Sequence, residues 1–317
     1  MNSLKRLIPI LLVCCCLSCG KDGTAADPLA DSGRTERTEL LLENLRDIVT
    51  EKGFLVGQQD ATLYGIGWSN EPERSDIQSV CGEMPALVGF DITGYATNDS
   101  LSSDNIEFAK ILAAAIWQYD HSGMVAMTGN AADIKFLNRL VTPYGVKVPV
   151  VFTPKDGVDA LVREIEDNDV TNALIASTED GEKVDVLTAS FAFSPEKEDS
   201  VSLMEEAQAL DAQLAKLQSL AKQKNKPFAL STLSYKGLKY AEFWTHILLP
   251  VLEKYNLSYI LLGSNADGST NDFCVPYLGH VGCADFVRFY NSKKSLFLKE
   301  TPAIYTNIKA HREKQAR

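Results

Sequence analysis

Four carboxylates directly follow short apolar runs of the sequence, where the ends of parallel strands would bring them to one edge of a sheet. They are Asp60, Asp91, Asp156 and Glu179. Carboxyl groups placed together can act as general acids, bases or nucleophiles. The remaining residues at these run ends carry hydroxyl, amide or amino groups, and none is His, Arg, Trp or Cys. They include Gln58, Gln59, Thr93, Thr128, Asn130, Thr153, Lys155, Ser177, Ser190, Thr232, Ser234, Ser264 and Asn265.

The sequence lacks the residue spacings that a metal site, a serine nucleophile or a phosphate-binding loop requires. No two of the histidines (His121, His246, His280 and His311) stand at the separations that bind a metal together. A Gly-x-Ser-x-Gly nucleophile motif and a glycine-rich phosphate loop are both absent. We therefore predict that the protein binds no metal and no cofactor.

The residues that carry the chemistry follow eight apolar runs, which alternate with longer amphipathic stretches. Nearly continuous apolar runs are typical of strands buried on both faces of a parallel sheet. Eight of them in one chain predict the α/β class and a (β/α)8 TIM barrel, with function at the carboxyl ends of the strands. The runs are 54–58, 86–92, 124–128, 148–153, 173–177, 184–189, 227–232 and 259–263.

Amphipathic stretches between the runs predict helices over 105–119, 201–222 and 238–255. One connection is anomalous. Only residues 178–183 separate the fifth and sixth runs, whereas a parallel crossover takes a dozen residues or more. Either the helix is missing there or the predicted strand ends are wrong.

Composition limits the class of partner. The 317 residues include 31 Lys and Arg against 42 Asp and Glu, a formal net charge of −11. This acidic balance argues against nucleic acid as a partner, because nucleic-acid binding needs clustered cations. No repeat or second composition regime follows residue 36, which predicts one domain and, we expect, a monomer.

The amino terminus has the pattern of an export signal. Lys5 and Arg6 precede an apolar run that is too short to span a bilayer, and the run ends in Leu17-Ser18-Cys19-Gly20. This end resembles the lipobox of bacterial lipoproteins. We predict a lipoprotein signal peptide over 1–18, lipidation at Cys19, a flexible tether over 19–35 and a barrel domain over 36–317. The only membrane contact would be this lipid anchor, in the bacterial cell envelope and most simply the outer membrane.

Three cysteines remain in the predicted domain. Cys274 and Cys283 are close enough in sequence to pair, although spacing alone leaves both a disulfide and free thiols open.

Two blocks of sequence resemble glycoside hydrolase family 26, which includes β-mannanases. The first runs from Gly53-Phe54-Leu55-Val56-Gly57-Gln58-Gln59-Asp60 through Leu63-Tyr64-Gly65-Ile66-Gly67-Trp68 to Cys81–Asp91. The second includes Val275-Pro276-Tyr277-Leu278-Gly279-His280 and Ala284-Asp285-Phe286-Val287-Arg288-Phe289-Tyr290. The resemblance covers most of residues 40–305 and implies the same barrel that the strand count predicts.

The resemblance also implies losses. In that family a glutamate acid/base follows the fourth strand and a glutamate nucleophile ends the seventh, and retaining hydrolysis requires both. Here these positions hold Gly157 and Thr232. Further family residues of the sugar cleft are replaced at Gln58, Gly129-Asn130, Thr153, Asp156, Ser190 and Gly263-Ser264.

From these residues we predict a lipid-anchored mannanase-type barrel that has lost hydrolysis and binds a glycan, β-mannan or a related polysaccharide, as an accessory to polysaccharide utilisation. We predict no catalytic residue and expect the following residues to line the cleft: Gln58, Asp60, Trp68, Asp91, Asn130, Asp156 and Ser264. The alternative is an active mannan endo-1,4-β-mannosidase-type hydrolase that uses relocated carboxylates, Asp156 with Glu179 or Asp60. A third possibility is a partner-binding barrel without affinity for sugars. Trp117 and Trp244 are expected in the core.

Overall fold

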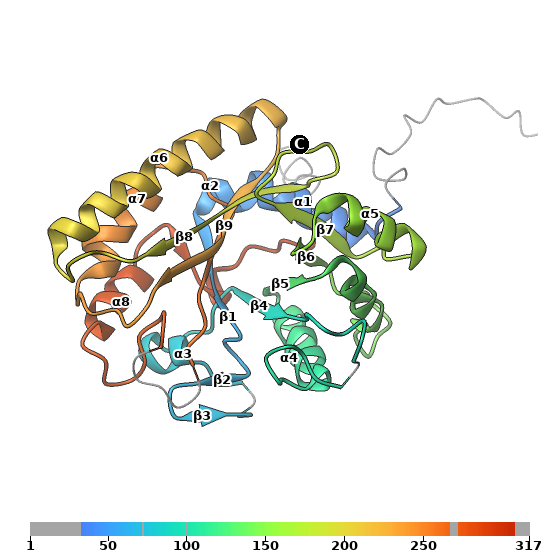
Figure 1. Ribbon diagram of the computed structural model, residues 1–317, viewed down its shortest axis with the longest axis horizontal. Helices are drawn as coiled ribbons and strands as arrows, with labels where there is room; N and C mark the ends of the chain where they lie inside the picture. Colours follow the sequence, from blue (N-terminus) through green and yellow to red (C-terminus); the bar gives the residue numbers. More distant parts are fainter. Residues whose placement is uncertain (1–32, 72, 99, 267–271, 308–317) are drawn as a thin grey trace, which may run out of the picture. The chain divides into compact units, whose positions relative to one another are not determined.

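The computed structural model describes residues 33–71, 73–98, 100–266 and 272–307. In this part of the chain, eight parallel strands hydrogen-bond in sequence order, and the last also pairs with the first (Figure 1). They are β1 (Phe54–Gln59), β4 (Leu87–Asp91), β5 (Met124–Gly129), β6 (Val150–Pro154), β7 (Ala173–Ser177), β8 (Val186–Phe193), β9 (Phe228–Tyr235) and β10 (Tyr259–Leu262). The predicted (β/α)8 barrel is confirmed.

Each apolar run of the sequence forms one barrel strand because both faces of the sheet are covered. In β1, for example, Phe54, Leu55 and Val56 are all fully buried. β8 and β9 continue beyond their apolar runs to Phe193 and Tyr235, and their outer halves are only partly buried. The short strand β11 (Ser295–Leu296) pairs with the first two residues of β1, and the hairpin of β2 (Tyr64–Gly65) and β3 (Trp68–Ser69) follows β1.

The longest helix matches its prediction closely. α6 (Ser200–Lys224) contains the predicted stretch 201–222, and its buried residues recur on one face. The Asp199 side chain accepts a hydrogen bond from the Ser202 amide, and Asn225 adopts a left-handed conformation at the other end. These two caps set the ends of the helix.

The other helices complete the outer layer. They are α1 (Glu36–Asn44), η2 (Leu45–Val49), α2 (Thr50–Lys52), α3 (Asp76–Cys81), α4 (Phe108–Asp120), η3 (Ala131–Arg139), α5 (Val158–Asp167), η4 (Phe243–Leu248), α7 (Leu249–Leu252), α8 (Cys283–Tyr290) and η5 (Leu298–Glu300). The single helix predicted over 238–255 is wrong: a π-helical turn, η4, leads into the short α7, which has Pro250 in its first turn. No described helix has the length and apolar character needed to cross a membrane.

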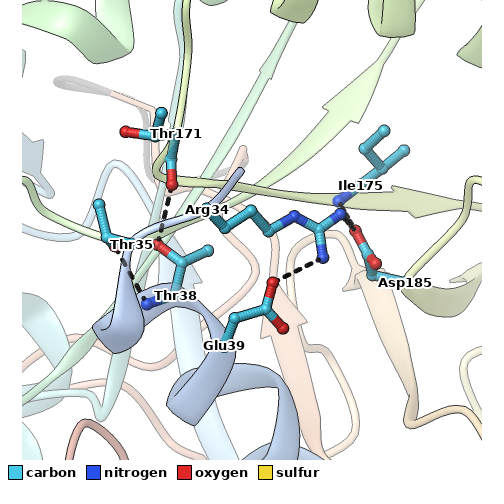
Figure 2. Close-up of polar contacts among 7 residues, drawn as sticks. All are labelled: Arg34, Thr35, Thr38, Glu39, Thr171, Ile175 and Asp185. Carbon is cyan, nitrogen blue, oxygen red and sulfur yellow. Dashed lines mark hydrogen bonds and ion pairs between the residues drawn. The ribbon is translucent and has the colours of Figure 1, made fainter. Parts of the chain in front are cut away.

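The connection between β7 and β8 has no helix in the structure. The space outside β7 is instead taken by α1, from the start of the described chain (Figure 1). Figure 2 shows how this segment is attached: the Arg34 guanidinium lies 2.7 Å from Asp185 Oδ2, and the Thr38 hydroxyl donates to the Thr171 carbonyl at 3.5 Å. The Thr35 amide donates to the same carbonyl at 2.8 Å. The short link is thus possible because a helix from elsewhere in the chain covers the strand.

Asp185 is central to this attachment. Its Oδ2 also accepts a hydrogen bond from the Ile175 amide of β7 at 2.7 Å. Burial raises the pKa of the Asp185 carboxyl, and the Arg34 cation opposes that rise. Residues 34 and 35, assigned to the tether because of their polar composition, are therefore fixed to the barrel. Residues 1–32, with the predicted signal peptide, Cys19 and most of the tether, lie outside the described residues.

Candidate functional site

A cleft of about 970 Å³ opens at the carboxyl ends of β1, β4, β5, β9 and β10. This is the end of a (β/α)8 barrel where ligands bind. Its walls are mainly hydroxyl, amide and carboxyl groups. They include Gln59, Asp60, Tyr64, Asp91, Asp104, Glu107, Thr128, Ser231, Thr232, Ser234, Ser264, Asp272 and Cys274. Of the residues predicted to line it, the cleft contains Asp60, Asp91 and Ser264.

Asp60 is the buried carboxylate of this cleft, with 4% of its surface exposed. It follows β1 with a left-handed backbone (φ 54°), and its amide donates to the Gly89 carbonyl of β4. The Tyr64 hydroxyl donates to its Oδ2 at 3.0 Å, and Gln59 Nε2 lies 3.4 Å from its Oδ1. Burial raises the pKa of the Asp60 carboxyl to about 7, against the opposing effect of these hydrogen bonds. Near neutral pH this group can therefore hold or release a proton.

The other carboxylates of the cleft are more exposed, and most are paired with lysines. Asp91 Oδ2 lies 2.7 Å from Lys155 Nζ, and its Oδ1 accepts from the Thr93 amide. Glu107 pairs with Lys110 and Asp272 with Lys236, each at 2.8 Å. Carboxylate oxygens of this kind can also accept hydrogen bonds from hydroxyl groups of a ligand.

One rim of the cleft is built around Asp76, the first residue of α3. Its two carboxyl oxygens accept hydrogen bonds from Trp68 Nε1 at 2.7 Å, the Ile66 amide at 3.0 Å and Asn265 Nδ2 at 2.6 Å. Asn265 in turn accepts from the amides of Cys274 and Val275. The network joins the β2–β3 hairpin to the segment that follows β10, so it holds two walls of the cleft in place.

Trp68 belongs to this network and does not line the cleft. It is 3% exposed, so its ring is unavailable for stacking on a ligand, contrary to the prediction. The physical reason is the Asp76 carboxylate, which draws the indole N–H inward. Trp244 is buried as expected, whereas Trp117 is only half-buried and donates to Glu73.

Thr232 and Gly157, where the family resemblance places the two glutamates, have different surroundings. Thr232 is exposed on β9 and lines the cleft beside Ser231 and Ser234. Gly157 is exposed at the start of α5, outside the cleft lining, with φ 103° and ψ 155°. Only glycine adopts this backbone conformation readily, so position 157 disfavours any side chain, a carboxylate included.

Three further residues predicted at the cleft lie outside its lining. Gln58 is 1% exposed, and its Oε1 has no hydrogen-bond partner among the described residues. Asn130 is half-buried at the start of η3. Asp156 accepts from the Ala131 amide at 2.7 Å, so this carboxylate caps the first turn of η3.

Glu179, the other relocated carboxylate considered above, is also exposed outside the lining. The pairs of Asp156 with Glu179 or Asp60 are therefore not assembled in the cleft.

Several lining residues had no signal in the sequence. Ser103, Asp104, Asn105, Ile106 and Glu107 come from the long loop between β4 and α4, and Asp272 comes from the segment after β10. The search for functional residues directly after predicted strands could not find them, because they enter the cleft from loops. Tyr64 could have been found, since it stands four residues after Asp60 in the motif of the first strand.

The cysteines of the described residues are not paired with one another. Cys81, Cys274 and Cys283 are all free in the structure, so Cys274 and Cys283 form no disulfide. Burial raises the pKa of the Cys274 thiol to about 11, which keeps it protonated in the cleft. Within the described ranges, no group of three or more His, Cys, Asp or Glu side chains is placed to hold a metal ion.

The structure is similar to solved structures of glycoside hydrolase family 26. The β-mannanase of this family from Bacteroides ovatus is 27% identical, with a TM-score of 0.77 over 86% of this chain and 98% of that one. The Bacillus sp. JAMB-750 endo-β-1,4-mannanase has 18% identity and a TM-score of 0.74, over 87% of this chain and 95% of that one. A family 26 protein from Muricauda sp. has 17% identity and a TM-score of 0.72, over 86% and 94%. No family model and no curated protein matches the sequence.

Proposed function

We propose that this chain is a mannanase-type barrel that binds β-mannan or a related polysaccharide in its cleft without hydrolysing it. The observation that carries the proposal is the state of positions 157 and 232: a glycine-only backbone outside the lining and a threonine hydroxyl inside it. In the alignment that the family resemblance gives, both members of the retaining pair are replaced. A threonine hydroxyl without an activating base cannot replace a carboxylate nucleophile.

Binding is supported by what the cleft retains. Its volume of about 970 Å³ lies at the upper end of the range for ligand sites. Hydroxyls from β9 and the residues after β10 stand along it, together with the exposed carboxylates of Asp104 and Glu107. Such groups can accept and donate hydrogen bonds to the hydroxyls of a sugar chain. The mannan-directed relatives among the neighbours make β-mannan the first ligand to test.

We expect the migration of the purified protein to be retarded in native gels that contain β-1,4-mannan. We also expect the protein to release no reducing sugar from mannan or mixed-linkage β-glucan. The B. ovatus β-mannanase serves as the active control. Loss of a catalytic pair should lower the rate by a factor on the order of 10⁴ or more. Sustained release of reducing sugar by the purified protein would refute the loss of hydrolysis, and absence of retardation would refute glycan binding.

A second candidate, an active hydrolase with relocated carboxylates, is favoured by one observation. Asp60 lies in the cleft with its pKa raised to about 7, as a general acid requires. If reducing sugar is released, Asp60→Asn should abolish the release while leaving the retardation by mannan in place. Asp156→Asn should have no effect on the release of reducing sugar, because Asp156 caps η3 outside the cleft lining.

We also propose that Cys19 carries a lipid that holds the protein at the bacterial cell envelope, with residues 20–32 as the tether. The pattern Leu17-Ser18-Cys19-Gly20 supports this. In cell fractionation, the wild-type protein should remain with the membranes, and Cys19→Ser should appear in the soluble fraction. A variant that stays with the membranes after this change would contradict the anchor.

A further inference from the structure

Asp60 stands apart in the charge pattern of the cleft. It is the carboxylate of the lining that is buried, whereas Asp91 is half-buried and Asp104, Glu107 and Asp272 are exposed. The two lysines of the lining are paired with other carboxylates, Lys110 with Glu107 and Lys236 with Asp272, and Lys155 is paired with Asp91. No described cation is therefore paired with Asp60.

The groups that face Asp60 are neutral or negative. Tyr64 and Gln59 supply its hydrogen bonds, and both are uncharged donors. The carboxylates of Asp91 and Asp104 act on it as like charges. Burial and the nearby Asp60 carboxylate raise the pKa of the Tyr64 hydroxyl, so this group stays protonated and keeps its hydrogen to donate.

Filling the cleft would change the solvation of Asp60. The cleft is open to water, which solvates the 4% of the Asp60 surface that remains exposed. An uncharged occupant displaces the water and brings no cation in exchange, which penalises the ionised form of the carboxyl group. The protonated form loses less, since its own O–H can donate to a hydroxyl group of the occupant.

We propose that the cleft binds an uncharged, hydroxyl-rich oligosaccharide together with one proton on Asp60, so that affinity falls as the pH rises. This inference rests on the proposed glycan binding. A chain that carries carboxylates, such as a polyuronate, would add negative charge beside Asp60, Asp91 and Asp104 and is disfavoured by the same geometry.

The sign of the effect follows from the two states of Asp60. In the free protein the group titrates near pH 7, and desolvation by the ligand moves its pKa in the complex higher. Between these two values, binding takes up a proton, and the dissociation constant rises by up to about tenfold for each pH unit. Below both values Asp60 is protonated in either state, and the affinity is constant.

The test is calorimetric titration of the protein with mannohexaose from about pH 5.5 to about pH 8.5, in pairs of buffers that differ in protonation enthalpy. For the wild type we expect the affinity to weaken by about tenfold or more across the alkaline half of this range, with proton uptake that approaches one per ligand. The Asp60→Asn variant should bind with an affinity that does not depend on pH and without proton uptake. The Asp91→Asn variant, a change of the same kind in the same cleft, should keep the pH dependence of the affinity.

The outcomes separate this inference from the function on which it rests. Binding without pH dependence, or a slope that Asp60→Asn retains, overturns the proton coupling and leaves glycan binding in place. Absence of binding at every pH overturns both. If Asp60→Asn does not fold, the proton uptake of the wild type decides: its absence overturns the coupling.

Discussion

Replacing Asp76 with alanine is expected to lower the free energy of unfolding by about 3–5 kcal/mol. The carboxylate is 4% exposed and accepts hydrogen bonds from the Ile66 amide, Trp68 Nε1 and Asn265 Nδ2. Alanine removes every one of these acceptors and leaves the donors in a space that is largely closed to water. The melting temperature should fall by roughly 10 °C, as measured by calorimetry or circular dichroism.

The same variant should lose affinity for mannan oligosaccharides, because the network holds the hairpin after β1 and the segment after β10 against each other. Asp76→Asn keeps one carbonyl oxygen and should fall between the alanine variant and the wild type. Glu71→Ala is the matched control: Glu71 forms an exposed ion pair with Arg74 in the same region, worth at most about 1 kcal/mol. A loss below about 1 kcal/mol for Asp76→Ala would show that water can replace the carboxylate.

Replacing Gly53 with alanine is the second change for which we expect a large effect. A Cβ atom at this position would lie 2.1 Å from the carbonyl oxygen of Lys294 and 2.8 Å from its carbonyl carbon. Both are backbone atoms, held where the Phe54 amide donates to Lys294 and β11 pairs with β1. The strand cannot yield as a flexible side chain would, so we expect a loss of about 3 kcal/mol or more in unfolding free energy.

The control for steric crowding is Gly181→Ala, measured by the same denaturant titration. A Cβ at Gly181 meets nothing closer than a Val184 methyl at 3.8 Å, an ordinary contact. This variant should differ from the wild type by about 0.5 kcal/mol or less. Equal losses for the two variants would indicate that the effect is a general cost of removing glycine, and not the approach of β11.

The barrel was predictable because its strands must be apolar on both faces. Buried parallel strands leave long apolar runs, so their number and order could be read directly, and α6 was visible from its periodic buried face. The ends of β8 and β9 were not predictable, since their outer halves are only partly buried and do not continue the apolar runs. The helix over 238–255 failed because apolar periodicity does not distinguish a π-helical turn from a continuous α-helix.

The cleft was only partly predictable. Asp60, Asp91 and Ser264 follow strands and line it, but Asp156 follows a strand equally closely and turns away to cap η3. Trp68 lies near the barrel mouth but turns inward, where its indole N–H donates to Asp76. Asp104 and Glu107 enter the cleft from a loop, and their distance from the predicted strand ends gave no reason to expect them there.

The amino-acid sequence by itself determined the class of fold, the order of the strands and the residue types at positions 157 and 232. These follow from local apolar patterning and from a motif read along the chain. Only the tertiary structure decided that Asp60 is buried with no cation of the described residues paired to it, that position 157 has a glycine-only backbone, and that Arg34 reaches Asp185 across 151 residues of sequence. Burial, backbone strain and charge pairing depend on which distant segments pack together, and no local pattern of residues encodes that choice.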